Sequence, residues 1–113
     1  MPNREHHAAP LEARIAALVR AGRPYLILAI PGEQSPAEAF AGPGLSATFM
    51  VDAGCAADTL NDPYLTGYVG QHVPIVFACK RKVDRQKLLD RRANFAARGY
   101  RLWQEDAHPQ GRA

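Results

Sequence analysis

Tyr25-Leu-Ile-Leu-Ala-Ile30 is an apolar run without alternation, and Pro31-Gly32 ends it. A strand with one face in water alternates apolar and polar residues, whereas a strand covered on both faces is apolar throughout. The run therefore predicts a strand inside a sheet, with helices packed on both of its faces.

Three further segments carry strand patterns. Val73–Cys79 is also apolar throughout, and its Pro74 suits only the start of a strand or a sheet edge, because proline cannot donate to a ladder. Leu45–Val51 predicts a strand that ends in a turn at 52–54. Tyr100–Gln104 alternates, which predicts a short strand at the edge of the sheet.

Helix signals precede and separate the first strands. Apolar residues recur at helical spacing from Leu11 to Val19, and Gly22 suits the C-terminal cap of that helix. Ser35 and Glu38 stand at capping-box spacing with a proline between them, which predicts the start of a second, short helix.

Two more helices are expected in the second half of the chain. Asp62-Pro63 opens a short helical turn that Gly67 and Gly70 break up. Asp84 caps a long helix that runs through Ala97, and Gly99 stops it.

The expected element order is therefore α-β-α-β-α-β-α-β, which indicates the α/β class. Alternation of this kind favours a four-stranded, mostly parallel sheet with helices on its faces. A mixed sheet is the alternative, because the middle connections hold only short helices. The length of 113 residues predicts one domain, at 9–105. The polar segments at 1–8 and 106–113 are expected to be flexible tails.

Composition narrows the class of protein. A hydrophobic fraction of 47% and a charged fraction of 22% are those of an ordinary globular domain. No apolar run is long enough to span a bilayer or to serve as a signal-peptide core, so we expect a cytoplasmic protein without a membrane partner. The glycines form no phosphate-binding loop and Cys55 and Cys79 have no metal spacing, so neither cofactor nor metal is expected.

The charges are concentrated near the C-terminus. Lys80–Arg101 contains nine of the fourteen Lys and Arg residues and two acids, Asp84 and Asp90, which gives the segment a charge of +7 against +3 for the chain. Such a segment predicts a surface for polyanions, with salt-dependent affinity and little sequence preference. The candidate anion-binding residues are Lys80, Arg81, Lys82, Arg85, Lys87 and Arg91.

The function that this charge favours is a non-enzymatic binding or regulatory module, whose partner is nucleic acid or an acidic protein surface. The ordinary alternative is a solvated helix whose charge only keeps the protein in solution. In the predicted helix, Arg92 falls inside the apolar stripe. Its stem would pack there with the guanidinium reaching water, or it would pair with Asp52 or Asp58.

The runner-up function is a small-molecule or phosphoryl-handling site at the ends of the strands, where α/β sheets commonly bind ligands. It would use Asp52, Cys55 and Lys80, with Asp52 and Cys55 as the weak catalytic candidates and Glu33 at a neighbouring strand end. Cys79 ends an apolar strand and is expected to be a small buried hydrophobe. A third possibility is an oligomer that forms through the edge strand at 100–104.

Overall fold

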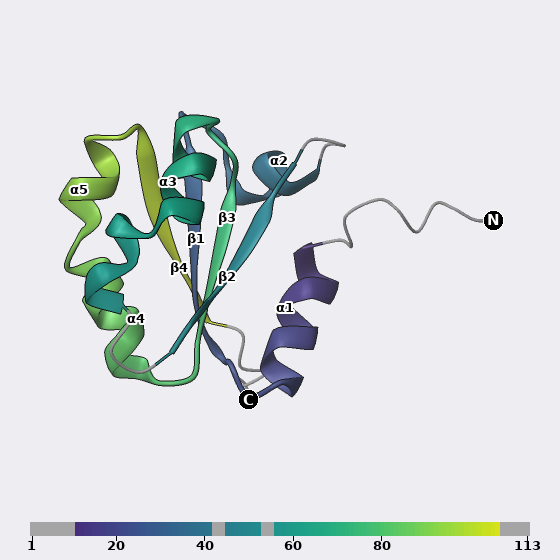
Figure 1. The fold of residues 1–113 in the computed structure, drawn as a ribbon. Coiled ribbons are helices and arrows are strands. Elements are labelled where there is room, and N and C mark those ends of the chain that lie inside the picture. Colours follow the sequence, from purple (N-terminus) through teal and green to yellow (C-terminus); the bar gives the residue numbers. More distant parts are fainter. Residues whose placement is uncertain (1–10, 42–44, 53–55, 107–113) are drawn as a thin grey trace.

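A single four-stranded sheet organises the computed structural model, which describes residues 11–41, 45–52 and 56–106 (Figure 1). The strand order is β2-β3-β1-β4. The strands are β1 (Tyr25–Pro31), β2 (Ala47–Val51), β3 (Ile75–Cys79) and β4 (Tyr100–Asp106). The predicted tails lie outside the described residues, apart from Asp106, which ends β4.

The helices form two layers around this sheet (Figure 1). One layer holds α1 and α2, and the other holds α3, α4, α5 and a 3-10 helix, η2. Their bounds are α1 (Leu11–Arg20), α2 (Pro36–Ala41), η2 (Ala56–Asn61), α3 (Pro63–Gly70), α4 (Lys82–Leu89) and α5 (Arg92–Ala96). None of the helices in the described part of the chain is both long enough and apolar enough to cross a membrane.

The prediction of mostly parallel strands is wrong, because β1 runs antiparallel to both of its neighbours. Only β2 and β3 are parallel, so the sheet is mixed. The length of α2 explains the direction of β2. Its six residues span about 9 Å, whereas seven strand residues span about 23 Å. The chain therefore enters β2 from the end of the sheet at which it leaves β1.

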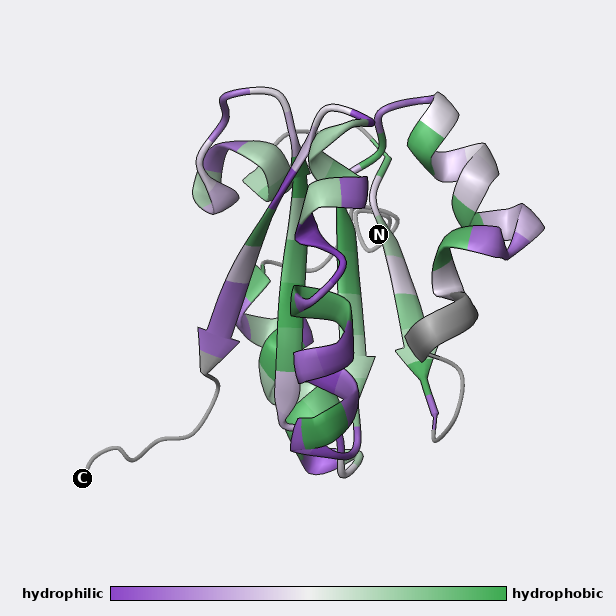
Figure 2. Ribbon diagram, turned by 90° about the vertical axis from the view of Figure 1, so that its left-hand side faces the viewer, coloured by the Kyte–Doolittle hydropathy of each residue, from purple (hydrophilic) through white to green (hydrophobic). Residues whose placement is uncertain are grey.

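The central strands are buried on both faces, as the unbroken apolar runs predict. On β1, Ile27 and Ala29 pack into the core beneath α3, α4 and α5, while Leu26, Leu28 and Ile30 pack into the core beneath α1 and α2. β3 divides its side chains between the two cores in the same way. Figure 2 shows the resulting hydrophobic strands in the interior, behind helices with mixed faces.

Local hydrogen bonds fix the helix starts that the sequence predicts. Ser35 N–H donates to Glu38 Oε1 (2.9 Å), and Glu38 N–H donates to Ser35 Oγ (3.2 Å), which completes the capping box of α2. Asp62 caps α3 by accepting from the N–H groups of Tyr64 (2.8 Å) and Leu65 (3.3 Å). The expected break at Gly67 is wrong, because α3 continues to Gly70.

The long helix predicted from Asp84 to Ala97 is also wrong, because it is two helices. α4 begins at Lys82, with Arg81 as its N-cap, so Asp84 lies inside the first turn. The chain leaves the helical path at Arg91 (φ −104°, ψ 16°) before α5 begins. This break turns Arg92 out into solvent, so the predicted position of Arg92 in an apolar stripe is wrong as well.

The cap at Asp62 gives a test of this fold. We expect Asp62→Ala to lower the free energy of unfolding by about 1 kcal/mol, because two N–H groups of α3 lose their acceptor. Asp62→Asn keeps an acceptor oxygen and should retain most of that stability. Urea unfolding of both variants, with Glu33→Ala as an exposed control, measures the difference. Equal stability of Asp62→Ala and Glu33→Ala would contradict the role of this cap.

Candidate anion-binding site

The parallel pairing of β2 and β3 places the C-terminal ends of both strands at the same end of the sheet, and two of the predicted site residues follow these ends. Val51 and Cys79 are paired, so Asp52 and Lys80 both leave the sheet at that edge. β1 is antiparallel to β3, so Glu33 follows the opposite end of the sheet and does not join them. Cys55 lies outside the described residues.

Arg23 occupies this edge and engages Asp52. One guanidinium nitrogen of Arg23 donates to Asp52 Oδ1 at 2.7 Å, and the other donates to the carbonyl oxygens of Ala78 (3.0 Å) and Val51 (3.4 Å). The Asp52 side chain is 57% exposed, but its charge is balanced by this ion pair. Sequence patterns did not single out Arg23, although it directly follows the glycine that caps α1.

The first turn of α4 contains a second ion pair. Arg81 donates through Nε (2.8 Å) and through a terminal nitrogen (2.9 Å) to the two oxygens of Asp84, which is only 1% exposed. These hydrogen bonds from Arg81 lower the pKa of Asp84. The Arg81 side chain pairs with Asp84 within the first turn of α4. It remains 49% exposed, so it is also accessible from solvent.

Arg85 is not available on the surface. It is 5% exposed, its guanidinium carbon lies 5.3 Å from the centre of the Tyr25 ring, and one of its nitrogens donates to the carbonyl oxygen of Glu105 (3.5 Å). It shares the inward face of α4 with Asp84 and Leu88. Arg85 therefore connects α4 to β1 and β4, and the structure removes it from the predicted anion-binding residues.

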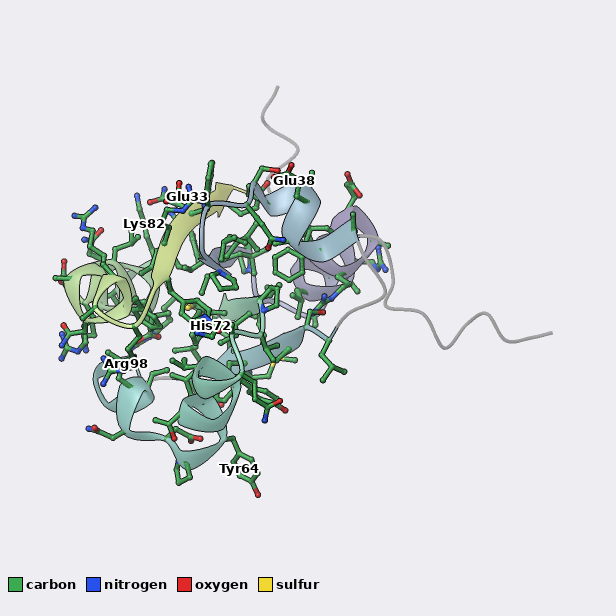
Figure 3. All side chains as sticks on the ribbon, turned by 90° about the horizontal axis from the view of Figure 1, so that it is seen from above. Glu33, Glu38, Tyr64, His72, Lys82 and Arg98 are labelled. Atoms are coloured by element: carbon green, nitrogen blue, oxygen red, sulfur yellow. The ribbon has the colours of Figure 1, made fainter. Side chains whose placement is uncertain are left out.

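The remaining cations form a surface over α4, α5 and the turn before α4, which faces the viewer in Figure 2. In Figure 3, Lys82 and Arg98 from its two ends lie on the same side of the molecule. We call this surface the basic face. Its exposed or half-buried members are Lys80, Arg81, Lys82, Lys87, Arg91, Arg92 and Arg98.

Among the side chains that the structure describes, one acid lies on the basic face itself. Asp90 is exposed and accepts a hydrogen bond from the Gln86 amide at 3.0 Å. Asp84 is buried beneath it and is paired with Arg81. The basic face therefore keeps an excess of positive charge after its internal ion pair is formed.

Cys79 is the cysteine within the described residues, and it ends β3. Cys79 is a buried thiol in the core, as predicted, and burial raises its pKa to about 12, so it stays protonated at neutral pH. Across residues 11–41, 45–52 and 56–106, no three His, Cys, Asp or Glu side chains gather in a way that could hold a metal ion.

The pair of Arg81 and Asp84 predicts how stability depends on pH. Because the pKa of Asp84 is lowered in the folded protein, the stability it contributes is fully present above the unfolded-state pKa of about 4. That contribution is lost as the pH falls through the lower folded-state pKa. We therefore expect Asp84→Asn to be less stable than the wild type at neutral pH and to lose less stability on acidification.

Urea unfolding followed across the acidic range measures both effects. Asp90→Asn, which neutralises an exposed acid on the same helix segment, is the matched control. Parallel stability curves for the wild type and Asp84→Asn would contradict the assignment.

Comparisons with protein-family models, with curated proteins and with solved structures find no match to this chain.

Proposed function

We propose that this protein is a binding module that holds an anionic partner, nucleic acid or an acidic protein surface, on the basic face. The observation that carries the proposal is the excess of exposed cations on one side of the molecule, with Asp90 as the exposed acid among them. Such an excess attracts polyanions over a distance set by the ionic strength.

Three cations of the basic face lie at the N-terminal end of α4. Lys80, Arg81 and Lys82 are exposed and immediately precede or open the helix. Cations at the N-terminus of a helix face the positive end of its dipole, which is unfavourable, and for Arg81 the ion pair with Asp84 in the first turn offsets this effect. A phosphate or carboxylate bound at this turn would offset the charges of Lys80 and Lys82, so we expect the turn to contribute to anion binding.

The mode of contact follows from which side chains are buried. Phe95 and Tyr100, the aromatic residues of α5 and the adjoining strand start, are in the core. The basic face therefore offers charges and few rings on which bases stack. Contacts to phosphates or carboxylates give affinity that falls with salt and depends little on sequence.

Charge reversal tests the proposal. We expect Lys82→Glu and Lys87→Glu each to weaken binding of a labelled mixed-sequence oligonucleotide about tenfold at low salt and to reduce the salt slope by about one. Fluorescence anisotropy measures both quantities. Arg20→Glu, an exposed reversal on α1 at the other face of the sheet, makes the same change in net charge and should retain most of the affinity.

The two classes of partner separate in the same assay. Binding of the oligonucleotide, but not of polyglutamate at equal charge, would identify nucleic acid, and the reverse would identify an acidic protein surface. Equal effects of Lys82→Glu and Arg20→Glu, or no binding of either polyanion at low salt, would contradict the proposed function.

The second candidate is a small-molecule or phosphoryl-handling site around Asp52, Cys55 and Lys80. The pairing of β2 with β3 supports it by placing Asp52 and Lys80 at one edge of the sheet. The ion pair with Arg23 weighs against Asp52 as a catalytic base. Thermal stabilisation by inorganic phosphate or small phosphate esters that disappears in Lys80→Ala, with Lys82→Ala unchanged, would favour this candidate over the first.

A further inference from the structure

β4 is an edge strand of seven residues that pairs with β1 on one side only. Figure 2 shows it along the left edge of the sheet. Its Trp103 is 39% exposed. We propose that two copies of this chain associate by antiparallel pairing of β4 with β4 of the second copy, which joins the two sheets into one.

The backbone of β4 defines which groups are available for this pairing. β1 and β4 pair with Pro31 opposite Tyr100, so Gly32 stands opposite Gly99. Gly32 N–H donates to the Gly99 carbonyl oxygen at 2.9 Å, which makes this a hydrogen-bonded pair. Hydrogen-bonded and non-hydrogen-bonded pairs alternate along an antiparallel ladder. The backbone groups of Arg101, Trp103 and Glu105 therefore point toward β1.

The alternate residues of β4 point their backbone N–H and C=O groups away from the sheet. These residues are Tyr100, Leu102, Gln104 and Asp106. A second β4, related by a two-fold axis at Trp103, sets Leu102 opposite Gln104 and Tyr100 opposite Asp106. In each of these pairs both residues present outward groups, so they exchange hydrogen bonds as an ordinary antiparallel ladder requires.

The side chains in this register are complementary in charge. With Trp103 on the axis, Arg101 of each copy lies opposite Glu105 of the other, on the face that also carries Trp103. These are non-hydrogen-bonded positions, where cross-strand side chains come closest and contribute most. A register centred on Leu102 sets Arg101 opposite Trp103, and one centred on Gln104 sets Trp103 opposite Glu105, so only the register centred on Trp103 forms both ion pairs.

The existing contacts of these side chains leave them able to pair. Arg101 donates through Nε to the Gly32 carbonyl oxygen (2.9 Å) and through one terminal nitrogen to the Gln34 carbonyl oxygen, and it lies over the Trp103 ring. A guanidinium has five N–H donors, so donors remain for a carboxylate. No described residue forms an ion pair with the Glu105 carboxylate. The second copy supplies a counter-charge for it.

The two-fold symmetry of the proposed dimer also determines where the basic faces of the two copies lie. A two-fold axis perpendicular to the joined sheet keeps equivalent faces on the same side. The α4 and α5 helices of both copies would then lie on one face of an eight-stranded sheet and present their cations together. The association itself does not depend on any anionic partner, so it is measured without one.

Sedimentation velocity over a range of concentrations tests the pairing. We expect the wild type to form dimers as concentration rises. Glu105→Arg should weaken dimerisation about tenfold or more, because two ion pairs become two like-charge contacts. Arg101→Glu should do the same. Glu12→Arg, which makes the same charge change on exposed α1, should leave the dimer unchanged.

Mixing supplies the sharpest form of this experiment. The Glu105→Arg variant carries arginine at positions 101 and 105, and the Arg101→Glu variant carries glutamate at both. Neither variant should form a homodimer, because like charges then face each other. A mixed dimer restores opposite charges at both contacts. We expect a heterodimer when the two are combined. Two folded variants that stay monomeric when mixed, at concentrations where the wild type dimerises, would overturn the proposed register.

Arg101→Glu also removes the hydrogen bonds of Arg101 to the loop after β1, so it could disturb the fold. Gln104→Pro avoids this problem and tests the backbone hydrogen bonds between the two β4 strands. Proline at 104 removes an outward N–H and no hydrogen bond to β1, a position that an edge strand tolerates. The variant should fold and stay monomeric. A monomeric wild type at high concentration, or a Gln104→Pro variant that dimerises like the wild type, would overturn the proposal.

Discussion

Five consecutive side chains of β1, from Leu26 to Ile30, are excluded from water. Removing each large apolar side chain from water contributes about 1.5–3 kcal/mol, so both faces of this strand must be covered for the chain to fold. α1 and α2 cover one face, and α3, α4 and α5 cover the other (Figure 1). The positions of the helices, and of the charges they carry, follow from this requirement.

The covering helices separate cations with structural roles from cations that face solvent. α4 packs its Asp84, Arg85 and Leu88 side inward, which buries Arg85 over Tyr25 and leaves Lys82 exposed. Arg23 lies at the ends of β2 and β3, where it donates hydrogen bonds to backbone carbonyl oxygens and forms an ion pair with Asp52. What remains on α4 and α5 is a surface of one predominant sign.

The sequence predicts the parts of this structure that local chemistry decides. Unbroken apolar runs identify the covered strands, and the spacing of Ser35 and Glu38 identifies a helix start that the structure confirms. Strand direction was mispredicted because it depends on how far α2 carries the chain. The burial of Arg85 and the exposure of Arg92 depend on the phase of α4 and on a break at Arg91, which neither glycine nor proline marks.

Backbone amide NMR of the labelled protein, titrated with a mixed-sequence oligonucleotide at low and then at higher salt, tests whether the basic face is the binding surface. We expect shift changes confined to residues 80–98, in the turn before α4, in α4 and in α5, and we expect them to disappear at higher salt. Shift changes centred on α1, or changes that persist at higher salt, would contradict this role of the basic face.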